Sequence, residues 1–246
     1  GQKSLEYWRP IVMRATNLKP VFPIDENSKG FLAESLKVTL EKKIVTGIRH
    51  LMSSQNVTLF IALQALTKAF LYKRYGCKEV AVGSVFSTRT LEIGPNDLGP
   101  YINVLPLLDS VCDNSSFVDF VKQVKETVIS SHKHRLASIA EITSPNSNVR
   151  LKRLFEVGLT LQNQALRPQE REDIFNSILR EVGRNDGLST NVWFDITELN
   201  DEIYIRLDYK KTSFTEEEAA DFINGWKTTI KMILNNPNIR MILLIQ

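Results

Sequence analysis

The sequence is poor in the side chains that most often carry metal or redox chemistry. Its 246 residues include only two cysteines, Cys77 and Cys112, and three histidines. The cysteines lack the spacing of metal ligands, and so low a count is typical of a reducing compartment with free thiols. His132 and His134 form an H-x-H pair at a helix end, where we interpret them as solvated cations, because no third ligand is near. We therefore expect no metal site.

An excess of one charge and long apolar runs are also missing. The chain carries 31 basic and 28 acidic residues, a net charge of +3, which is too small to indicate a nucleic-acid partner without a recognition motif. No apolar run is long enough to cross a bilayer, and there is no signal peptide. We expect a cytoplasmic protein that binds neither nucleic acid nor membrane. Because the chain starts at Gly1 without an initiator methionine, we expect a processed or partial chain.

None of the common catalytic sequence motifs is present. There is no GxSxG, no Walker A motif and no Rossmann glycine fingerprint. The stretch from Gly94 to Gly99 lacks the strand-to-helix context of a phosphate-binding loop. His50 is interpreted as a surface or partly packed residue and Asp186 as a turn residue. Residue chemistry alone therefore assembles no active site.

The strongest positive pattern runs from Thr58 to Arg89 and predicts a helix followed by a buried strand. Apolar side chains recur on one helical stripe, at Leu59, Leu63, Leu66 and Phe70. Thr58 is a favourable N-cap and Gly76 a favourable helix stop. The nearly continuous apolar run over 80–86 is typical of a strand buried on both faces. A helix that leads into such a strand indicates an α/β fold.

Strand and helix patterns alternate along the rest of the chain. Period-two alternation predicts strands over 34–41, 155–162, 192–196 and 203–209, the last two joined as a hairpin by Asn200-Asp201. Helical spacing predicts helices over 42–54, over 114–131 and from Thr215 onward, where Glu218 completes a capping box. Residues 4–18 contain Pro10 and are expected to form a helix end or an irregular approach. The apolar stretch 239–245 is expected to be a strand or an extended tail.

Two features stand apart from this scaffold. Asn103 is the one polar residue in the apolar run 101–107. We interpret it as a satisfied amide that holds a loop, with a hydrogen-bond donor at the wall of a substrate channel as the alternative. The polar segment 163–187, which has room for a short helix over 174–179, is too long for an ordinary connection unless it carries structure or function.

Several stretches together resemble the C-terminal half of the condensation domains of nonribosomal peptide synthetases, members of the chloramphenicol acetyltransferase-like superfamily. Residues 59–89 match the family's LF…RY-G…VG…R pattern, and 98–107 are similar to its IGxFVNTLPLR motif. Residues 154–163 resemble NPLFQVMFVLQN, and 194–196 resemble the FDLTL strand. Tyr7-Trp8 is similar to the YW that follows the family's first half, and His134 to the histidine of HQDLPFE. The motifs keep their order over nearly the whole chain.

The departures from the family pattern concern chemistry. The family's catalytic HHxxxDG belongs to its N-terminal half and is absent from this sequence, so we assign no catalytic residue. Leu108 stands where the motif has arginine, and Arg153 replaces a proline. Residues 136–139 replace the acid, proline and phenylalanine of HQDLPFE.

The resemblance implies an α/β lobe over residues 1–246, with a mixed sheet flanked by helices. Residues 1–33 would be a linker from a missing N-terminal lobe, and 163–197 would form a floor loop and a strand that crosses to that lobe. The family's active-site tunnel lies between its lobes. The implied tunnel candidates are Gly83, Ser84, Arg89, Tyr101, Asn103 and Gln162, with Gly83-Ser84 beginning a turn that lines the tunnel.

The implied function is amide-bond formation between a donor acyl or peptidyl carrier protein and an aminoacyl acceptor. The lobe would bind no cofactor directly, and the phosphopantetheine arms of carrier proteins would be substrates. Its partners would be an N-terminal lobe and carrier proteins, and a lone lobe would self-associate through an exposed apolar face. The alternatives are a non-catalytic module that binds carrier proteins or a partner lobe, and a lobe of a coenzyme A-dependent acyltransferase.

Overall fold

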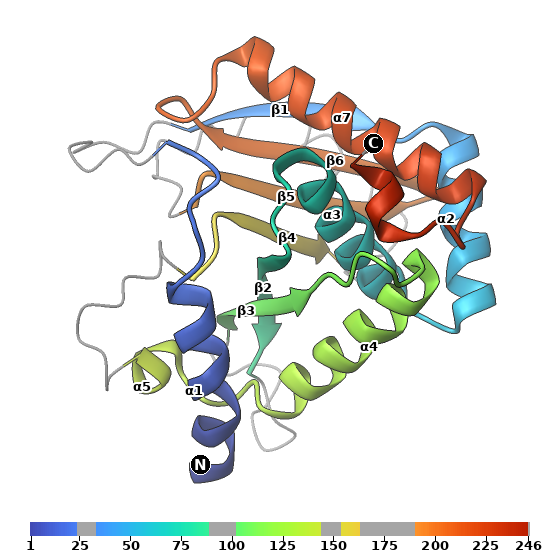
Figure 1. Cartoon of the computed structure of the whole chain (residues 1–246). Coiled ribbons are helices and arrows are strands. Elements are labelled where there is room, and N and C mark those ends of the chain that lie inside the picture. The colour runs from blue at the N-terminus through green and yellow to red at the C-terminus, as the bar shows by residue number, and fades with distance from the viewer. Residues whose placement is uncertain (24–32, 89–101, 144–153, 163–189, 246) are drawn as a thin grey trace.

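The chain folds around a single mixed sheet (Figure 1). The computed structural model describes residues 1–23, 33–88, 102–143, 154–162 and 190–245. Its strands are β1 (Ala33–Thr39), β2 (Glu79–Ser87), β3 (Ile102–Ser110), β4 (Val157–Gln162), β5 (Val192–Leu199) and β6 (Glu202–Lys210). They lie in the order β1-β6-β5-β4-β2-β3. Strands β2, β4 and β5 are parallel to one another, and the remaining pairs are antiparallel. The expected mixed α/β architecture is confirmed.

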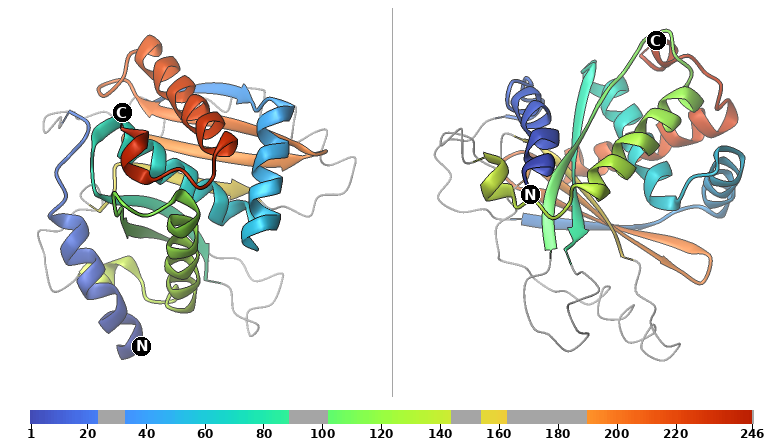
Figure 2. Two further views of the ribbon diagram at one scale, coloured as in Figure 1. Left: turned by 45° about the vertical axis from the view of Figure 1, so that its right-hand side comes forward. Right: turned by 90° about the horizontal axis from the view of Figure 1, so that it is seen from below.

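Helices lie on both faces of the sheet (Figure 2). One face packs against α2 (Lys42–Gln55), α3 (Leu59–Tyr75), α4 (Phe117–Lys133) and α7 (Glu216–Asn235). The other face carries α1 (Gln2–Thr16) and the short α5 (Ile139–Thr143), next to β3. Buried apolar side chains accordingly form two clusters. We call the larger one, with Phe194 and Trp226, the first core, and the smaller one, with Trp8 and Phe155, the second core.

The helix predicted after Thr58 is confirmed, including both of its ends. The Thr58 side chain accepts a hydrogen bond from the Ile61 N–H, and Gly76 ends the helix at a φ of 67°, in the left-handed region that suits glycine. The predicted apolar stripe was too narrow, however. Every residue from Ile61 to Tyr72 is buried, because α3 packs against the sheet and also contacts α2, α4 and α7.

Local rules also predicted the hairpin and the start of α7. Asn200 and Asp201 have φ values of 52° and 64°, which places both turn residues in the left-handed region, as a type I′ hairpin turn requires. At α7, the Thr215 side chain accepts from the Glu218 N–H, and the Glu218 carboxylate accepts from the Thr215 N–H at 2.8 Å. The predicted capping box is confirmed.

The two ends of the chain were predicted wrongly. Residues 2–16, in the stretch that we expected to be the end of a helix or an irregular approach, form the whole helix α1, with Pro10 inside it. Trp8, Val12 and Ala15 are buried at helical spacing, so packing of this stripe outweighs the backbone hydrogen bond that Pro10 cannot make. The final stretch is a 3-10 helix, η2 (Met241–Leu244), rather than a strand. Its buried side chains, Met241 and Leu244, are three residues apart and face the first core.

Strand β5 lies inside the sheet, with β4 and β6 hydrogen-bonded to its two edges. The expected crossing of residues 190–197 toward a partner lobe stays a prediction. Phe194 and Ile196 point into the first core. None of the described helices is long and apolar enough to cross a membrane.

Candidate functional site

Several motif residues gather at one end of the sheet, which we call the C-terminal edge. The parallel strands β2, β4 and β5 all finish there, and β3, antiparallel to β2, begins there, with Asn103 opposite Phe86. At the ends of β4 and β5, Gln162 is paired with Thr197. In α/β sheets, ligands commonly bind outside the carboxyl ends of parallel strands. The C-terminal edge is therefore the candidate functional site.

Asn103 fastens the segment after α4 to the start of β3. Its side-chain Nδ2 donates to the backbone oxygens of Arg135 at 3.1 Å and Ala137 at 2.5 Å, and the residue is 8% exposed. Arg135 in turn donates from Nε to the Ser87 backbone oxygen at 2.9 Å. Both amide hydrogens of Asn103 are thus engaged, so only its Oδ1 is left for a ligand. The geometry supports the interpretation of a satisfied amide that holds a loop.

The end of α4 is also fastened to α1, through residues of two other motifs. The Trp8 Nε1–H donates to the His134 backbone oxygen at 2.9 Å. The rings of Tyr7 and His134 stack with centroids 4.4 Å apart, and His134 Nδ1 lies 3.2 Å from the Ser4 hydroxyl. Burial raises the pKa of Tyr7. Tyr7, Trp8, Asn103 and His134 therefore meet at one corner of the fold, where they join α1, β3 and α4.

Gly83 and Ser84 do not form the expected turn. Both lie in the middle of β2, paired with β3 on one side and with β4 on the other. The ring of Phe155 occupies the space that a Cβ atom at Gly83 would need. Ser84 is fully buried, accepts a hydrogen bond from Gln64 Nε2 at 2.6 Å and donates to the Leu159 backbone oxygen at 3.0 Å. Gly83 makes room for the Phe155 ring, and Ser84 forms hydrogen bonds to α3 and β4. These two residues therefore serve contacts between elements, whereas we had expected them to begin a turn.

Gln162 belongs to a polar row that crosses three strands on the side away from the first core. Its Nε2 donates to Asp195 Oδ1 at 3.1 Å. Arg206 then pairs with Asp195 at 2.8 Å and with Asp208 at 3.0 Å, and these three side chains are 16 to 20% exposed. Sequence reasoning missed this row. Strand alternation predicts it, because Asp195 and Arg206 are register partners in β5 and β6 and both alternate with core residues.

The other tunnel candidates, Arg89 and Tyr101, lie outside the described residues, as does the segment 163–187 of the expected floor loop.

A buried ion pair lies between α3 and β3. Lys68 Nζ is 2.5 Å from Asp109 Oδ2, and the two side chains are 0% and 1% exposed. Burial lowers the pKa of Lys68, and the charge and hydrogen bond of the Asp109 carboxylate act in the opposite direction without cancelling that effect. Burial also acts to raise the pKa of Asp109, but the charge and hydrogen bond of Lys68, together with the hydrogen bonds from Thr127 and Gln123, outweigh it and hold that pKa below its ordinary value. Asp109 is therefore a fixed anion rather than a proton carrier.

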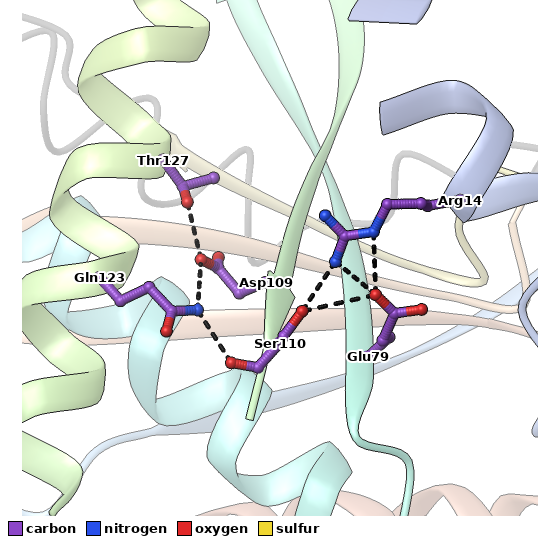
Figure 3. A network of polar contacts seen from close by, with 6 residues as sticks. All are labelled: Arg14, Glu79, Asp109, Ser110, Gln123 and Thr127. Carbon is purple, nitrogen blue, oxygen red and sulfur yellow. Dashed lines mark hydrogen bonds and ion pairs between the residues drawn. The ribbon is translucent and has the colours of Figure 1, made fainter. Parts of the chain in front are cut away.

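Figure 3 shows how Asp109 belongs to a wider network. Asp109 Oδ1 accepts from Thr127 at 2.7 Å and from Gln123 at 3.2 Å, both on α4. On the other side of β3, Arg14 of α1 donates to the Ser110 hydroxyl at 2.7 Å and pairs with the Glu79 carboxylate (Figure 3). This network lies at the opposite end of β2 and β3 from the C-terminal edge and holds α1 and α4 to the same strands.

Among the described residues, no group of three His, Cys, Asp or Glu side chains could hold a metal ion. At the C-terminal edge, the side-chain nitrogens of Asn103 and Gln162 already donate hydrogen bonds within the chain.

Comparison with known proteins indicates the same family as the sequence motifs. A family model described as "Condensation domain" matches residues 1–241. The chain is 25% identical over 249 residues to Gramicidin S synthase 2 of Brevibacillus brevis and 24% identical over 227 residues to Bacitracin synthase 1 of Bacillus licheniformis. These matches cover 97% and 88% of this chain but only 6% and 4% of the two synthases.

Solved structures share the fold at low sequence identity. A four-domain nonribosomal peptide synthetase bound to AMP and glycine superposes with a TM-score of 0.81 at 15% identity, over 98% of this chain and 20% of that one. The condensation domain from Monacolin K polyketide synthase gives a TM-score of 0.77 at 14% identity, over 98% of this chain and 58% of that one. This chain thus spans little more than half of the latter.

Proposed function

Since this chain belongs to the condensation-domain family, we propose that it is the C-terminal lobe of a nonribosomal peptide synthetase condensation domain. One observation carries the proposal: residues 1–241 match the family, yet the chain spans 58% of a solved condensation-domain chain and contains no HHxxxDG. A lobe without that motif supplies binding surface and leaves the reacting base to its partner lobe.

In the intact domain, the amine of a carrier-bound aminoacyl acceptor attacks the thioester carbonyl of a carrier-bound donor. The C–N bond of an amide forms, the C–S bond breaks, and the donor's phosphopantetheine thiol is released. The proton lost by the amine is taken up by a base outside this chain and passes on to the departing thiolate, which leaves as the thiol. The lobe's part is to line the path of the two phosphopantetheine arms along its C-terminal edge, near Asn103 and Gln162. We place this reaction in the cytoplasm, where Cys77 and Cys112 remain free thiols.

The proposal is tested by complementation. The isolated chain, incubated with a loaded donor and a loaded acceptor carrier protein, is expected to give no amide product, because the reacting base is absent. Addition of an N-terminal lobe that contains HHxxxDG is expected to restore product, measured by mass spectrometry of the acceptor arm. The same lobe with its second motif histidine changed to alanine is the control. Product formed by this chain alone would refute the proposal.

A binding module without chemistry is the second candidate. One structural neighbour is the X-domain from teicoplanin biosynthesis, solved in complex with OxyB, with a TM-score of 0.74 at 17% identity. The altered residues 136–138 of this chain lie at the corner with Asn103, where Leu136 is 52% exposed. Binding of a carrier protein or partner lobe, measured by calorimetry, together with no product after complementation would favour this alternative.

A further inference from the structure

The polar row that starts at Gln162 extends over four strands on the side of the sheet away from the first core. We call Gln162, Asp195, Arg206, Asp208 and Ser35 the polar row. Gln162 Nε2 donates to Asp195 Oδ1 at 3.1 Å, and Arg206 pairs with Asp195 at 2.8 Å and with Asp208 at 3.0 Å. The Ser35 hydroxyl donates to Asp208 Oδ1 at 2.5 Å. The row thus runs from the C-terminal edge, on β4, to the edge strand β1.

The charges of the polar row explain why an amide stands at its end. The two carboxylates carry one charge more than the single guanidinium, and their side chains are 20% and 16% exposed. Carboxylates with so little contact with water need hydrogen-bond donors. Arg206 donates to both, and each then receives one neutral donor, Gln162 for Asp195 and Ser35 for Asp208. Each carboxylate is therefore held from two sides.

This arrangement fixes the orientation of the Gln162 amide. An ionised carboxylate only accepts hydrogen bonds, so Asp195 binds Nε2 of Gln162 and turns Oε1 away. Arg206 Nη2 holds the other carboxylate oxygen, Oδ2 of Asp195. Within the part of the chain that the structure describes, Gln162 Oε1 has no hydrogen-bond partner. Because Gln162 is the last residue of β4, its oxygen is a fixed acceptor at the C-terminal edge.

We propose that Gln162 Oε1 accepts a hydrogen bond from an amide N–H of a phosphopantetheine arm, and that Asp195 and Arg206 are positioning residues for this acceptor. The inference rests on the proposed function and assigns one contact of the arm to one atom. The arm carries two amide N–H donors, whereas its phosphate is anionic and only accepts. An acceptor backed by a row of net negative charge favours the amides and repels the phosphate. The amide part of the arm therefore passes Gln162.

Asp195→Asn tests the positioning role, with Asp208→Asn as the matched control. Each change removes one carboxylate that pairs with Arg206, but only Asp195 contacts Gln162. In Asp195→Asn, Arg206 retains the amide oxygen, so the new NH₂ group faces Gln162 and draws its Oε1 inward.

The measurement is the complemented reaction with a lobe that contains HHxxxDG. Asp195→Asn is expected to raise the KM for at least one loaded carrier protein about five- to tenfold, as the loss of one hydrogen bond predicts, with kcat nearly unchanged. Asp208→Asn is expected to leave both constants unchanged. Equal effects of the two variants would show a merely structural role and overturn the proposal.

Gln162→Leu removes the acceptor itself. It is expected to raise the same KM by a similar factor, and Asp195→Asn is expected to add nothing in the Gln162→Leu background, because both changes remove one contact. Additive effects would mean that Asp195 acts through another group and would overturn the positioning role. If Asp195→Asn does not fold, an unchanged KM in Gln162→Leu is the result that overturns the proposal.

A binding measurement separates this inference from the proposed function. The ¹⁵N-labelled chain, mixed with the partner lobe, is titrated with pantetheine, which has both amides of the arm but no phosphate. The side-chain NH₂ signals of Gln162 are expected to shift, and those of Gln123, at the opposite end of β3 in the Asp109 network, to stay unchanged. Absence of product from the wild-type chain would refute the proposed function alone. Product formation without a shift at Gln162 would overturn this inference alone.

Discussion

At the scale of single residues, the sequence indicates which side chains are unusual better than it indicates what they do. Asn103 was singled out because an amide in an apolar run must find partners, and the structure supplies two backbone oxygens. For Gly83 and Ser84, the family resemblance implied the start of a turn that lines a tunnel, whereas the structure places both in the middle of β2. The glycine at position 83 makes room for the ring of Phe155, which packs over the strand, and no local pattern contains such a contact between distant segments.

The buried ion pair gives a prediction with a defined sign. Asp109→Asn leaves the Lys68 ammonium buried without an opposite charge, and we expect the free energy of unfolding to fall by about 3–5 kcal/mol in urea titrations. The double variant Lys68→Met/Asp109→Leu is expected to recover most of that loss, because it removes both charges. Asp221→Asn, at an exposed ion pair, should cost at most about 1 kcal/mol. A double variant as unstable as the single one would contradict this view.

The same pair predicts how stability depends on pH. Burial alone would raise the pKa of Asp109, but Lys68, Thr127 and Gln123 together outweigh it, and the pKa in the fold lies below the ordinary value. A lowered carboxyl pKa stabilises the fold above the unfolded-state pKa of about 3.9, and this contribution is lost as the pH falls through the folded-state pKa. The stability gap between wild type and Asp109→Asn should therefore narrow below about pH 4. Urea titrations from pH 7 to pH 3 measure it, and a gap independent of pH would refute the assignment.

Gly83→Ala tests the packing interpretation of the motif glycine. A methyl group at Gly83 would overlap the Phe155 ring, and such overpacking costs about 1–3 kcal/mol. The double variant Gly83→Ala/Phe155→Leu should recover part of the loss by making room. Gly1→Ala, where no atom lies within 4 Å of the added carbon, is the control. An unchanged thermal midpoint for Gly83→Ala would show that the ring moves aside freely.

At the scale of helices and strands, prediction succeeded where the cause is local. Helix α3, the 200–201 hairpin turn and the α7 capping box follow from caps, glycine and alternation within a few residues. Prediction failed for α1 because Pro10 signals a break, while the burial of Trp8 that outweighs it depends on the second core. The row of Asp195, Arg206 and Asp208 was within reach of strand alternation, once β5 and β6 were paired in register.

Trp8 is expected to hold α1 in place. Trp8→Ala removes a fully buried indole from the second core, and we expect a loss of about 3–5 kcal/mol. Trp8→Phe keeps most of the apolar contact and loses the Nε1 hydrogen bond to His134, so it should cost less, about 1–2 kcal/mol. Near-ultraviolet circular dichroism and limited proteolysis within 2–16 measure the outcome. A Trp8→Ala variant as stable as the wild type would contradict the packing of α1 through the second core.

At the scale of the whole molecule, the proposed lobe is expected to self-associate when alone. Large apolar side chains stand exposed on its surface: Met13, Ile102, Leu136, Leu243 and Ile245. Ile102 and Leu136 flank the corner fastened by Asn103. Sedimentation is expected to show a mass that rises with concentration, reduced in Ile102→Ser/Leu136→Ser. A monomer at all concentrations would refute it.

The order of strands in the sheet has a consequence for biosynthesis. Strand β1 stands at one edge, and its neighbour is β6, with Ala33 opposite Lys210. During synthesis β1 leaves the ribosome well before its partner β6, so it stays unpaired while most of the described chain is made. Strands β2 and β3, which are closer in sequence, can pair soon after both have emerged. Contacts so distant in sequence are slow to form, because the intervening chain must first be ordered. Among the described strands, β1 is therefore expected to be one of the last to be paired.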